Sequence, residues 1–457
     1  MDLRLVSRVL FLRAAWRPRD RWDTARIEEQ QQQALKDLRN AAYKRSAFYR
    51  RHHAGLFDAP LDQLPPVTKS DLMENFDDAV TAPGLSLALL EDHLHSLTQG
   101  GGDPGTPWKG RWWSAATAGT TGRRGTFLWD RPEWATVLAS YARAYDWAGI
   151  PAGLSRPLKV ALVSSLVPTH QSAVVGASLR SALVPTLRLD VTAPMQDTVA
   201  ALNGFQPRVL VGYASALLPL AAEQLAGRLR ISPQGVMSAS EVLTPQTAAD
   251  LEAAWGTAPF DVYAATETAG IASPCEFRNK HIYEDLLIVE PVDRAGKAVP
   301  PGTTAAKILV SVLFSRTLPL IRYEMSDSIS LGGRGCPCGR SFTLLQGIEG
   351  RLEDILQLPG RQGTVNIHPN VFHHVLDQAA SSGWQVVQEP SRLRILLAGI
   401  TPAGTTERIR ADVESALGAA GAARIPLEVR VVEHLERTPL GKAPFVRAWA
   451  SGARDRP

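Results

Sequence analysis

Short apolar runs alternate with helix-like segments through the middle of the chain, and this alternation constrains the fold more than any other feature of the sequence. Strands that alternate with helices predict a parallel sheet, whose ligands bind beyond the carboxyl ends of the strands. Two of the strand-like runs end in polar residues, Ser238–Glu241 and Thr266–Glu267, which would lie at these carboxyl ends. The four strand-like runs are Lys159–Leu166, Pro207–Tyr213, Gly235–Glu241 and Phe260–Glu267.

The rest of the chain changes character twice. Helices are expected between about residues 21 and 51, and from residue 286 the pattern becomes strands and turns, typical of a β-barrel-like subdomain. After residue 350 a compact α+β unit follows. A chain of 457 residues is also long for one core. We therefore expect an α/β protein with a large domain over residues 1–350 and a small C-terminal domain over 351–457.

Composition excludes several classes of protein. Hydrophobic residues make up 45% and charged residues 21%, as in soluble globular proteins, and no apolar run is long enough to insert into a membrane. Arginines interrupt the apolar N-terminal stretch, which argues against a secretory signal. A net charge of +4 does not favour nucleic acid as a partner. Three cysteines form no disulfide framework, so we expect a cytoplasmic protein.

The first fifty residues are more basic than the rest, with twelve Lys or Arg and six Asp or Glu. This excess has two interpretations. One is a contact with an anionic partner or surface, and the other, which we favour from the sequence, is a solvated helix face.

The segment TAGTTG (117–122) consists of small and hydroxyl residues with two glycines, between Ser114 and Arg123–Arg124. Such a loop lets backbone N–H groups and Thr hydroxyls surround phosphate oxygens, because no side chain blocks the approach. It lacks the Gly-Lys-Ser/Thr ending of a Walker loop. Taken alone, the segment is explained at least as well by a flexible surface loop.

Four further motifs follow in a fixed order. With the first, they resemble the adenylate-forming superfamily of acyl- and aryl-CoA ligases, adenylation domains and luciferases, over nearly the whole chain. The short form of each motif and the segment CPCGR are most similar to the phenylacetate–CoA ligase branch. The four motifs are VYAATE (Tyr263, Thr266, Glu267), RYEMSD (Arg322, Asp327), GRLEDIL (Gly350, Arg351, Glu353) and RTPLGK (Gly441, Lys442).

The resemblance implies an enzyme that joins a carboxylic acid to ATP with release of pyrophosphate. Carboxylate and triphosphate repel each other, so catalysis must come from alignment and charge neutralisation. The phosphates would be held by Thr117, Gly119, Thr120, Thr121 and Gly122. Arg123 and Arg124 stand where relatives often have a Lys, and whether they contact phosphate or solvent is open from the sequence.

The same resemblance assigns the remaining nucleotide contacts. Glu267 would bind Mg²⁺, because a hard carboxylate suits a hard cation. Thr266 would contact the α-phosphate, and Tyr263 would stack on adenine. Asp327 would accept hydrogen bonds from both ribose hydroxyls, although Ser326 replaces the usual Gly before it. Further contacts are expected from Ser240, Glu241 and Arg351.

Lys442 is the expected catalytic residue, by its PLGK setting. A Lys carried by a mobile domain can bridge the incoming carboxylate and the α-phosphate in the transition state. Glu353 falls at the hinge position of the family, where the small domain would swing between two half-reactions. The residue there is normally Asp or Lys.

All three cysteines fall in two local groups, PCEFRNKH (Cys275, His281) and GCPCG (Cys336, Cys338). A Cys₃His set suits a structural zinc ion, which would leave no open position for catalysis. The Cys-x-Cys spacing is tighter than the common two-residue gap. The alternative is three unrelated buried thiols.

The sequence says least about the carboxylic acid substrate and about the acceptor of its acyl group. By family position, His170, Tyr213, Ala239 and Ala264 would line a flat acyl pocket, which an aromatic acid would fit; His170 is as well explained as an ordinary loop histidine. Coenzyme A is the expected acceptor. The alternatives are a biosynthetic enzyme that transfers the acyl group to a carrier-protein thiol or an amine, and an inactive nucleotide-binding relative. The oligomeric state stays open, a homodimer being one option.

Overall fold

The structure is a computed structural model of the whole chain. It describes residues 2–100, 102–117, 124–150, 157–179, 181, 183–351, 356–360, 363–367, 369–376, 379, 381, 383–399, 404–437 and 443–448. Among these residues, no helix is both long and apolar enough to cross a membrane.

The N-terminal region is helical, as predicted. Helix α1 (Leu3–Trp16) begins at Asp2, whose carboxylate accepts from the backbone N–H groups of Arg4 and Leu5. Thr68 forms a capping box with Asp71 at the start of α4. The other elements here are η1 (Arg17–Arg21), α2 (Thr24–Arg45), α3 (Ala47–His52), η2 (Leu61–Gln63), α4 (Lys69–Glu74), α5 (Phe76–Ala79) and α6 (Leu87–Thr98).

A nine-stranded sheet forms the centre of the large domain, in the order β13-β14-β9-β8-β7-β6-β5-β3-β4. The five strands β4-β3-β5-β6-β7 are parallel, so the predicted parallel α/β layer is confirmed. One strand, β4 (Thr186–Asp190), was not predicted; none of its residues is buried, so it lacks the apolar signal of a core strand. The predicted strands are β3 (Val160–Ser164), β5 (Val209–Gly212), β6 (Gly235–Ala239) and β7 (Phe260–Ala265).

Helices connect these parallel strands, as crossover connections require. Helix α7, which precedes them, is buried along most of its length because it packs against both α1 and β8. The helices are α7 (Arg131–Trp147), α8 (Gln171–Leu179), α9 (Met195–Phe205), α10 (Ala214–Leu225) and α11 (Pro245–Trp255).

The strands from β8 to β14 pair in antiparallel fashion. Four of them continue the main sheet, and β10, β11 and β12 form a separate sheet tied to β13 by a bridge between Thr304 and Ser330. A short hairpin, β1 (Trp113–Ala116) with β2 (Thr126–Trp129), lies nearby. The other strands are β8 (Ala269–Pro274), β9 (Lys280–Ile282), β10 (Leu287–Val292), β11 (Lys307–Val312), β12 (Tyr323–Met325), β13 (Asp327–Leu331) and β14 (Leu344–Arg351).

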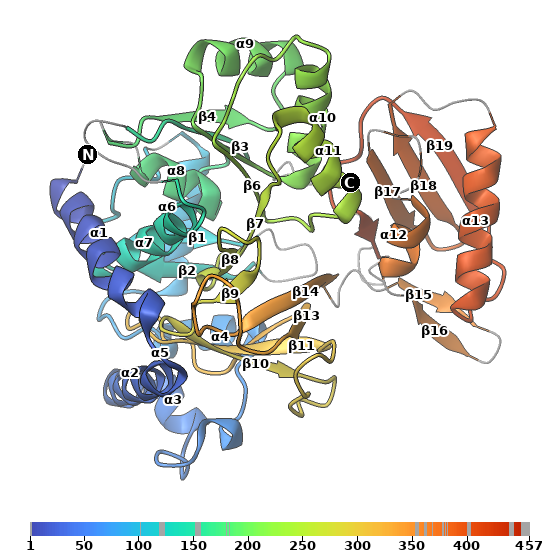
Figure 1. Cartoon of the computed structure of the whole chain (residues 1–457). Helices are drawn as coiled ribbons and strands as arrows, with labels where there is room; N and C mark the ends of the chain where they lie inside the picture. Colours follow the sequence, from blue (N-terminus) through green and yellow to red (C-terminus); the bar gives the residue numbers. More distant parts are fainter. Residues whose placement is uncertain are drawn as a thin grey trace.

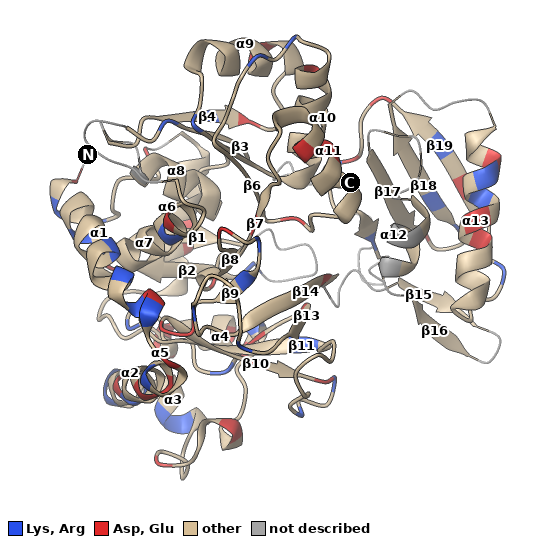
Figure 2. Cartoon of the chain, in the orientation of Figure 1, with Lys and Arg blue, Asp and Glu red and all other residues tan. Residues whose placement is uncertain are grey.

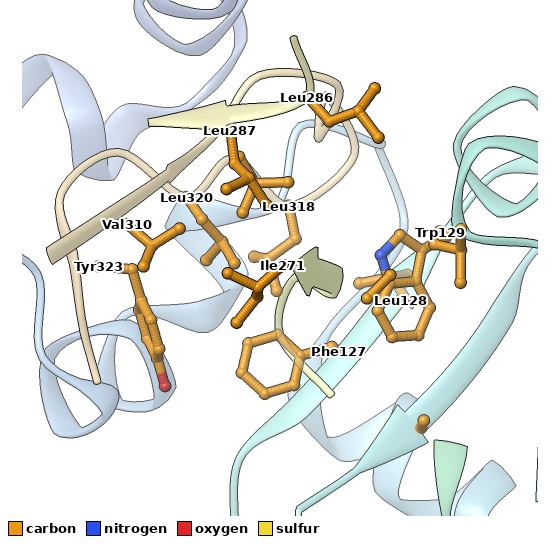
Figure 3. Packing of buried hydrophobic residues seen from close by; sticks show 14 of the residues in the cluster. Phe127, Leu128, Trp129, Ile271, Leu286, Leu287, Val310, Leu318, Leu320 and Tyr323 are labelled. Atoms are coloured by element: carbon orange, nitrogen blue, oxygen red, sulfur yellow. The ribbon is translucent and has the colours of Figure 1, made fainter. Parts of the chain in front are cut away.

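The largest core cluster joins segments that are far apart in sequence. Figure 3 shows Phe127 and Trp129 of β2 facing Ile271 of β8 and Tyr323 of β12. Burying side chains of this size contributes about 1.5–3 kcal/mol each. This cluster therefore fixes the hairpin against the sheets.

The residues after β14 form a separate layer with its own hydrophobic core (Figure 1). A four-stranded sheet in the order β19-β18-β17-β20 packs against α12 and α13. The elements are β15 (Leu356–Pro359), β16 (Thr364–Ile367), α12 (Asn370–Leu376), β17 (Gly383–Gln388), β18 (Leu393–Ala398), α13 (Thr405–Ala419), β19 (Leu427–Val432) and β20 (Val446–Arg447).

A buried ion-pair network ties the N-terminal segment to the large domain. Arg143 of α7 makes two hydrogen bonds to Asp285, at 2.7 and 2.8 Å, and Arg19 adds a third at 2.9 Å. Burial raises the pKa of the Asp285 carboxyl, but the two guanidinium groups outweigh burial and lower it below its ordinary value.

Candidate functional site

The carboxyl ends of four neighbouring parallel strands bring together the sequence-predicted residues. The register aligns Gly212 with Ser238 and Ala239 with Val262, so the segments that leave these strands lie side by side. His170 lies beyond β3, Tyr213 beyond β5, Ser240–Glu241 beyond β6 and Thr266–Glu267 beyond β7. This is the edge of a parallel sheet at which ligands bind.

The predicted phosphate loop connects the two strands of the β1–β2 hairpin. Thr117 closes its base, because its N–H donates to the Gly125 carbonyl at 2.8 Å and its Oγ1 accepts from the Gly125 N–H at 3.0 Å. Gly119, Thr120, Thr121 and Gly122, and Arg123 with them, lie outside the described residues. Arg124 donates to Thr169 Oγ1 at 2.5 Å, so its guanidinium faces the segment beyond β3.

Tyr263 and Asp327, which are both predicted to bind the nucleotide, contact each other in the fold. Tyr263 Oη donates to Asp327 Oδ2 at 2.8 Å, and the Asp327 side chain is nearly buried. Asp327 also pairs with Arg351 in the antiparallel register of β13 and β14. Three residues separated by up to 88 positions in sequence (351 − 263) therefore meet at one place.

Thr266 and Glu267 follow β7 directly, and both are half-buried. The sequence analysis missed a residue that holds this turn. Gln171, at the start of α8, donates from Nε2 to the Thr266 carbonyl at 3.1 Å and accepts from Tyr141 Oη at 2.8 Å. A glutamine outside any motif carries no signal in a single sequence, so only the fold shows this contact.

Glu241 links the two layers of the molecule. Its Oε2 accepts from the Ser215 N–H at 2.9 Å, and its Oε1 accepts from Ser215 Oγ at 3.0 Å. Oε1 also accepts from the backbone N–H of Ala443 at 3.1 Å. Ser240 has a φ of +70°, unusual for a residue other than glycine, and such backbone strain is typical of functional sites.

Ala443 directly follows Lys442 in the last motif. Lys442, Gly441 and the hinge residue Glu353 lie outside the described residues. The contact with Glu241 places Ala443 at the carboxyl edge of the sheet, on the side where β6 pairs with β7.

The predicted acyl-pocket residues differ in how far their side chains are buried near the carboxyl edge of the sheet. Tyr213 is 2% exposed and belongs to a core cluster, with its hydroxyl accepting from the Ser165 N–H at 3.2 Å. His170 is buried, and its Nδ1 lies 2.8 Å from Ser172 Oγ. Ala239 and Ala264 are half-buried at the ends of β6 and β7.

The four predicted zinc ligands meet in one cluster, with all their ligand atoms within 4.8 Å of one another. Cys275 Sγ lies 3.7 Å from Cys336 Sγ, and Cys338 Sγ lies 3.3 Å from His281 Nε2. The other ring nitrogen of His281 bonds to the Phe342 carbonyl at 3.2 Å, as is usual for a metal-binding histidine.

The thiols of this cluster differ in acidity. Burial, together with the neighbouring Cys336 and Cys338, raises the pKa of Cys275 to about 12, against the hydrogen bonds of the Phe277 and Asn279 backbone. Burial also disfavours the Cys336 thiolate, but hydrogen bonds from the Cys338 backbone and the Asn279 side chain outweigh it and lower the Cys336 pKa. The same burial lowers the pKa of His281, which favours the neutral ring that binds metals.

No protein-family model matches the chain. Phenylacetate-coenzyme A ligase of Thermus thermophilus is 25% identical over 373 residues, which cover 76% of this chain and 74% of the relative. Protein CapK of Staphylococcus aureus is 23% identical over 66% of this chain and 63% of CapK, slightly less than two thirds of that protein.

Among solved structures, 2-hydroxyisobutyryl-CoA ligase in its postadenylation state has a TM-score of 0.74 at 20% identity, with 95% of this chain and 91% of that chain covered. The same ligase in its thioesterification state gives 0.60, over 94% and 91%. The resemblance drawn from the five motifs is thereby confirmed, and the chain has the fold of the adenylate-forming CoA ligases.

Proposed function

We propose that this protein is an AMP-forming acid–CoA ligase. The observation that supports the proposal is the hydrogen bond from Ala443 to Glu241, because it joins the residue that follows Lys442 in sequence to the carboxyl edge of the sheet. A catalytic lysine needs this placement to reach a nucleotide bound at that edge.

In the first half-reaction, a carboxylate oxygen of the substrate attacks the α-phosphorus of ATP, and the bond to pyrophosphate breaks. Lys442 would neutralise the charge of both anions as they approach. Asp327 would hold the ribose, and Thr266 would contact the α-phosphate. The half-buried Glu267 offers the oxygen ligands that suit Mg²⁺, which neutralises phosphate charge when bound.

In the second half-reaction, the thiol sulfur of coenzyme A attacks the acyl carbon and AMP leaves. The thiol loses its proton in this step. Glu353 would act as the hinge through which the small domain turns away from the sheet edge. The Glu241–Ala443 hydrogen bond must then break, because it joins the two domains.

The test is acid-dependent exchange of pyrophosphate into ATP across a panel of aryl and acyl acids. We expect exchange with the unmodified protein and a loss of about 100-fold or more in Lys442→Ala, since one preorganised charge typically contributes that much. Lys297→Ala, in a turn after β10, is the matched control. No exchange with any acid would favour a nucleotide-binding relative without catalysis, and exchange without consumption of coenzyme A would favour a carrier-protein thiol or an amine as the acceptor.

We also propose that Cys275, His281, Cys336 and Cys338 hold a structural zinc ion. The compact donor set, the oriented His281 ring and the spread of the ligands over two segments support this proposal. The ion would join the β8–β9 turn to the segment before β14, so it would stabilise the side of the sheet that carries Asp327.

Elemental analysis of the purified protein tests the metal site, with one zinc per chain expected. Cys338→Ser should lower both the zinc content and the melting temperature. Ser341→Ala, in the same segment, is the control. Zinc well below one per chain in the unmodified protein would refute the site without bearing on the ligase activity.

A further inference from the structure

Helix α1 exposes an apolar surface that no described residue covers. Leu3 is 70% exposed, Phe11 67% and Leu10 43%. The opposite side of the helix is used for packing, because Leu5 and Trp16 are buried and α1 packs against α7. Exposed side chains of this size are ordinary when scattered, but these three share one helix face.

Helical geometry places arginines along the edges of that surface. With about 100° between successive residues, Leu3 and Leu10 lie close together and Phe11 lies about 80–100° away. Arg4 and Arg8 lie beyond Phe11, and Arg17 continues the other edge beside Leu10. These three arginines are exposed, and no ion pair involves them in the described part of the chain.

The acidic residues of this segment are engaged elsewhere. Asp2 caps α1 and pairs with Arg131. Asp20 accepts from the Trp147 indole N–H at 3.0 Å, and Asp146 neutralises Arg13. The exposed face therefore combines an apolar centre with positive charge at both sides (Figure 2).

We propose that this face of α1 docks on the surface of an anionic lipid bilayer. Leu3, Leu10 and Phe11 would enter the boundary between headgroups and acyl chains, and the arginines would bind the lipid phosphates and carboxylates. A helix that lies in the interface in this way needs no membrane-spanning segment. The exposed apolar side chains make this interpretation of the basic N-terminal region stronger than a solvated helix face, which we favoured from the sequence.

Two other occupants fit the surface less well. A second copy of the chain would present the same arginines, so a two-fold contact would bring like charges together. A nucleic acid would bind the arginines but leave the apolar side chains without a partner. Of these three occupants, only an anionic bilayer uses both the charge pattern and the apolar centre.

Docking through α1 leaves the rest of the enzyme free to work. Figure 1 shows α1 at the edge of the molecule opposite α12, α13 and β19. The C-terminal layer thus points away from the docked surface. The inference does not depend on the ligase activity.

The test is co-sedimentation of the full chain with vesicles of phosphatidylcholine and phosphatidylserine, compared with phosphatidylcholine alone. We expect binding only to the anionic vesicles, and weaker binding at higher salt. Arg4→Gln with Arg8→Gln should weaken it on the order of 30-fold. Leu3→Ser with Phe11→Ser should weaken it at least as much. Leu225→Ser, an equally exposed leucine on α10, is the matched control and should bind normally.

Three results would overturn the proposal. The first is equal binding to both vesicle types, and the second is unchanged binding by the two double variants. The third is the absence of vesicle binding together with a dimer that the Leu3→Ser and Phe11→Ser changes dissociate. Unaltered melting temperatures of the variants would show that they fold, so a loss of binding then reports the surface itself.

Discussion

Replacing Glu241 with glutamine tests whether the Ala443 contact holds the catalytic segment in place. From the described residues, the carboxylate accepts two hydrogen bonds from Ser215 and one from Ala443. Glutamine keeps one oxygen, and its NH₂ group can donate to the Ser215 hydroxyl but not to a backbone N–H. The amide oxygen will therefore stay on the Ser215 N–H, and the NH₂ group will face the Ala443 N–H.

The substitution thus removes the interdomain bond while it keeps the bonds within the large domain. A hydrogen bond to a charged group contributes about 1.5–3 kcal/mol. The Glu241 side chain is only half-buried, so we take the lower end of this range. A loss of about 1.5 kcal/mol corresponds to a decrease of about 10-fold in the equilibrium constant for forming the adenylating arrangement.

Two assays separate this effect from a general defect. Pyrophosphate exchange should fall about 10-fold in Glu241→Gln, since 1.4 kcal/mol is a factor of ten. Thioester formation from preformed acyl-adenylate and coenzyme A should be unchanged, because that step uses the other domain arrangement. Glu223→Gln, which makes the same chemical change at an exposed pair with Arg228 on α10, should affect neither rate. An equal fall in both rates, or normal exchange, would refute this role of the Glu241–Ala443 hydrogen bond.

Further predictions concern the ribose site and the buried network. Asp327→Asn should raise the KM for ATP about 10-fold, because the amide loses charge-assisted hydrogen bonds, whereas Tyr263→Phe should change it less; steady-state kinetics measure both. Asp285→Asn should lower the free energy of unfolding by about 3 kcal/mol, measured by chemical denaturation, because Arg143 keeps a buried charge without its partner. The folded-state pKa of Asp285 is below its unfolded value, so its stabilisation is present above about pH 4 and is lost as the pH falls. The variant should therefore show a flatter decline in acid, and an identical acid profile would contradict this account.

Much of the fold could be predicted from the sequence. The apolar runs that became β3, β5, β6 and β7 are buried on both faces of the sheet, and such strands have a local signal. β4 has no such signal, since its residues are only half-buried and one of them is Arg188. The strands β10, β11 and β12 pair in sequence order, in the region where strands and turns were predicted, whereas the pairing of β9 with β14 joins distant segments, which a single sequence does not specify.

The candidate site could likewise be predicted from the sequence only in part. The chemical types of residue could be identified from the motifs, which keep Tyr263, Asp327 and Glu267 at recognisable local spacings. The contacts could not: the fold shows that Tyr263 donates to Asp327, that Gln171 donates to the Thr266 carbonyl and that Glu241 accepts from Ala443. The physical reason is that hydrogen bonds depend on positions in space to within a few tenths of an ångström, and these are fixed by packing between segments far apart in the chain.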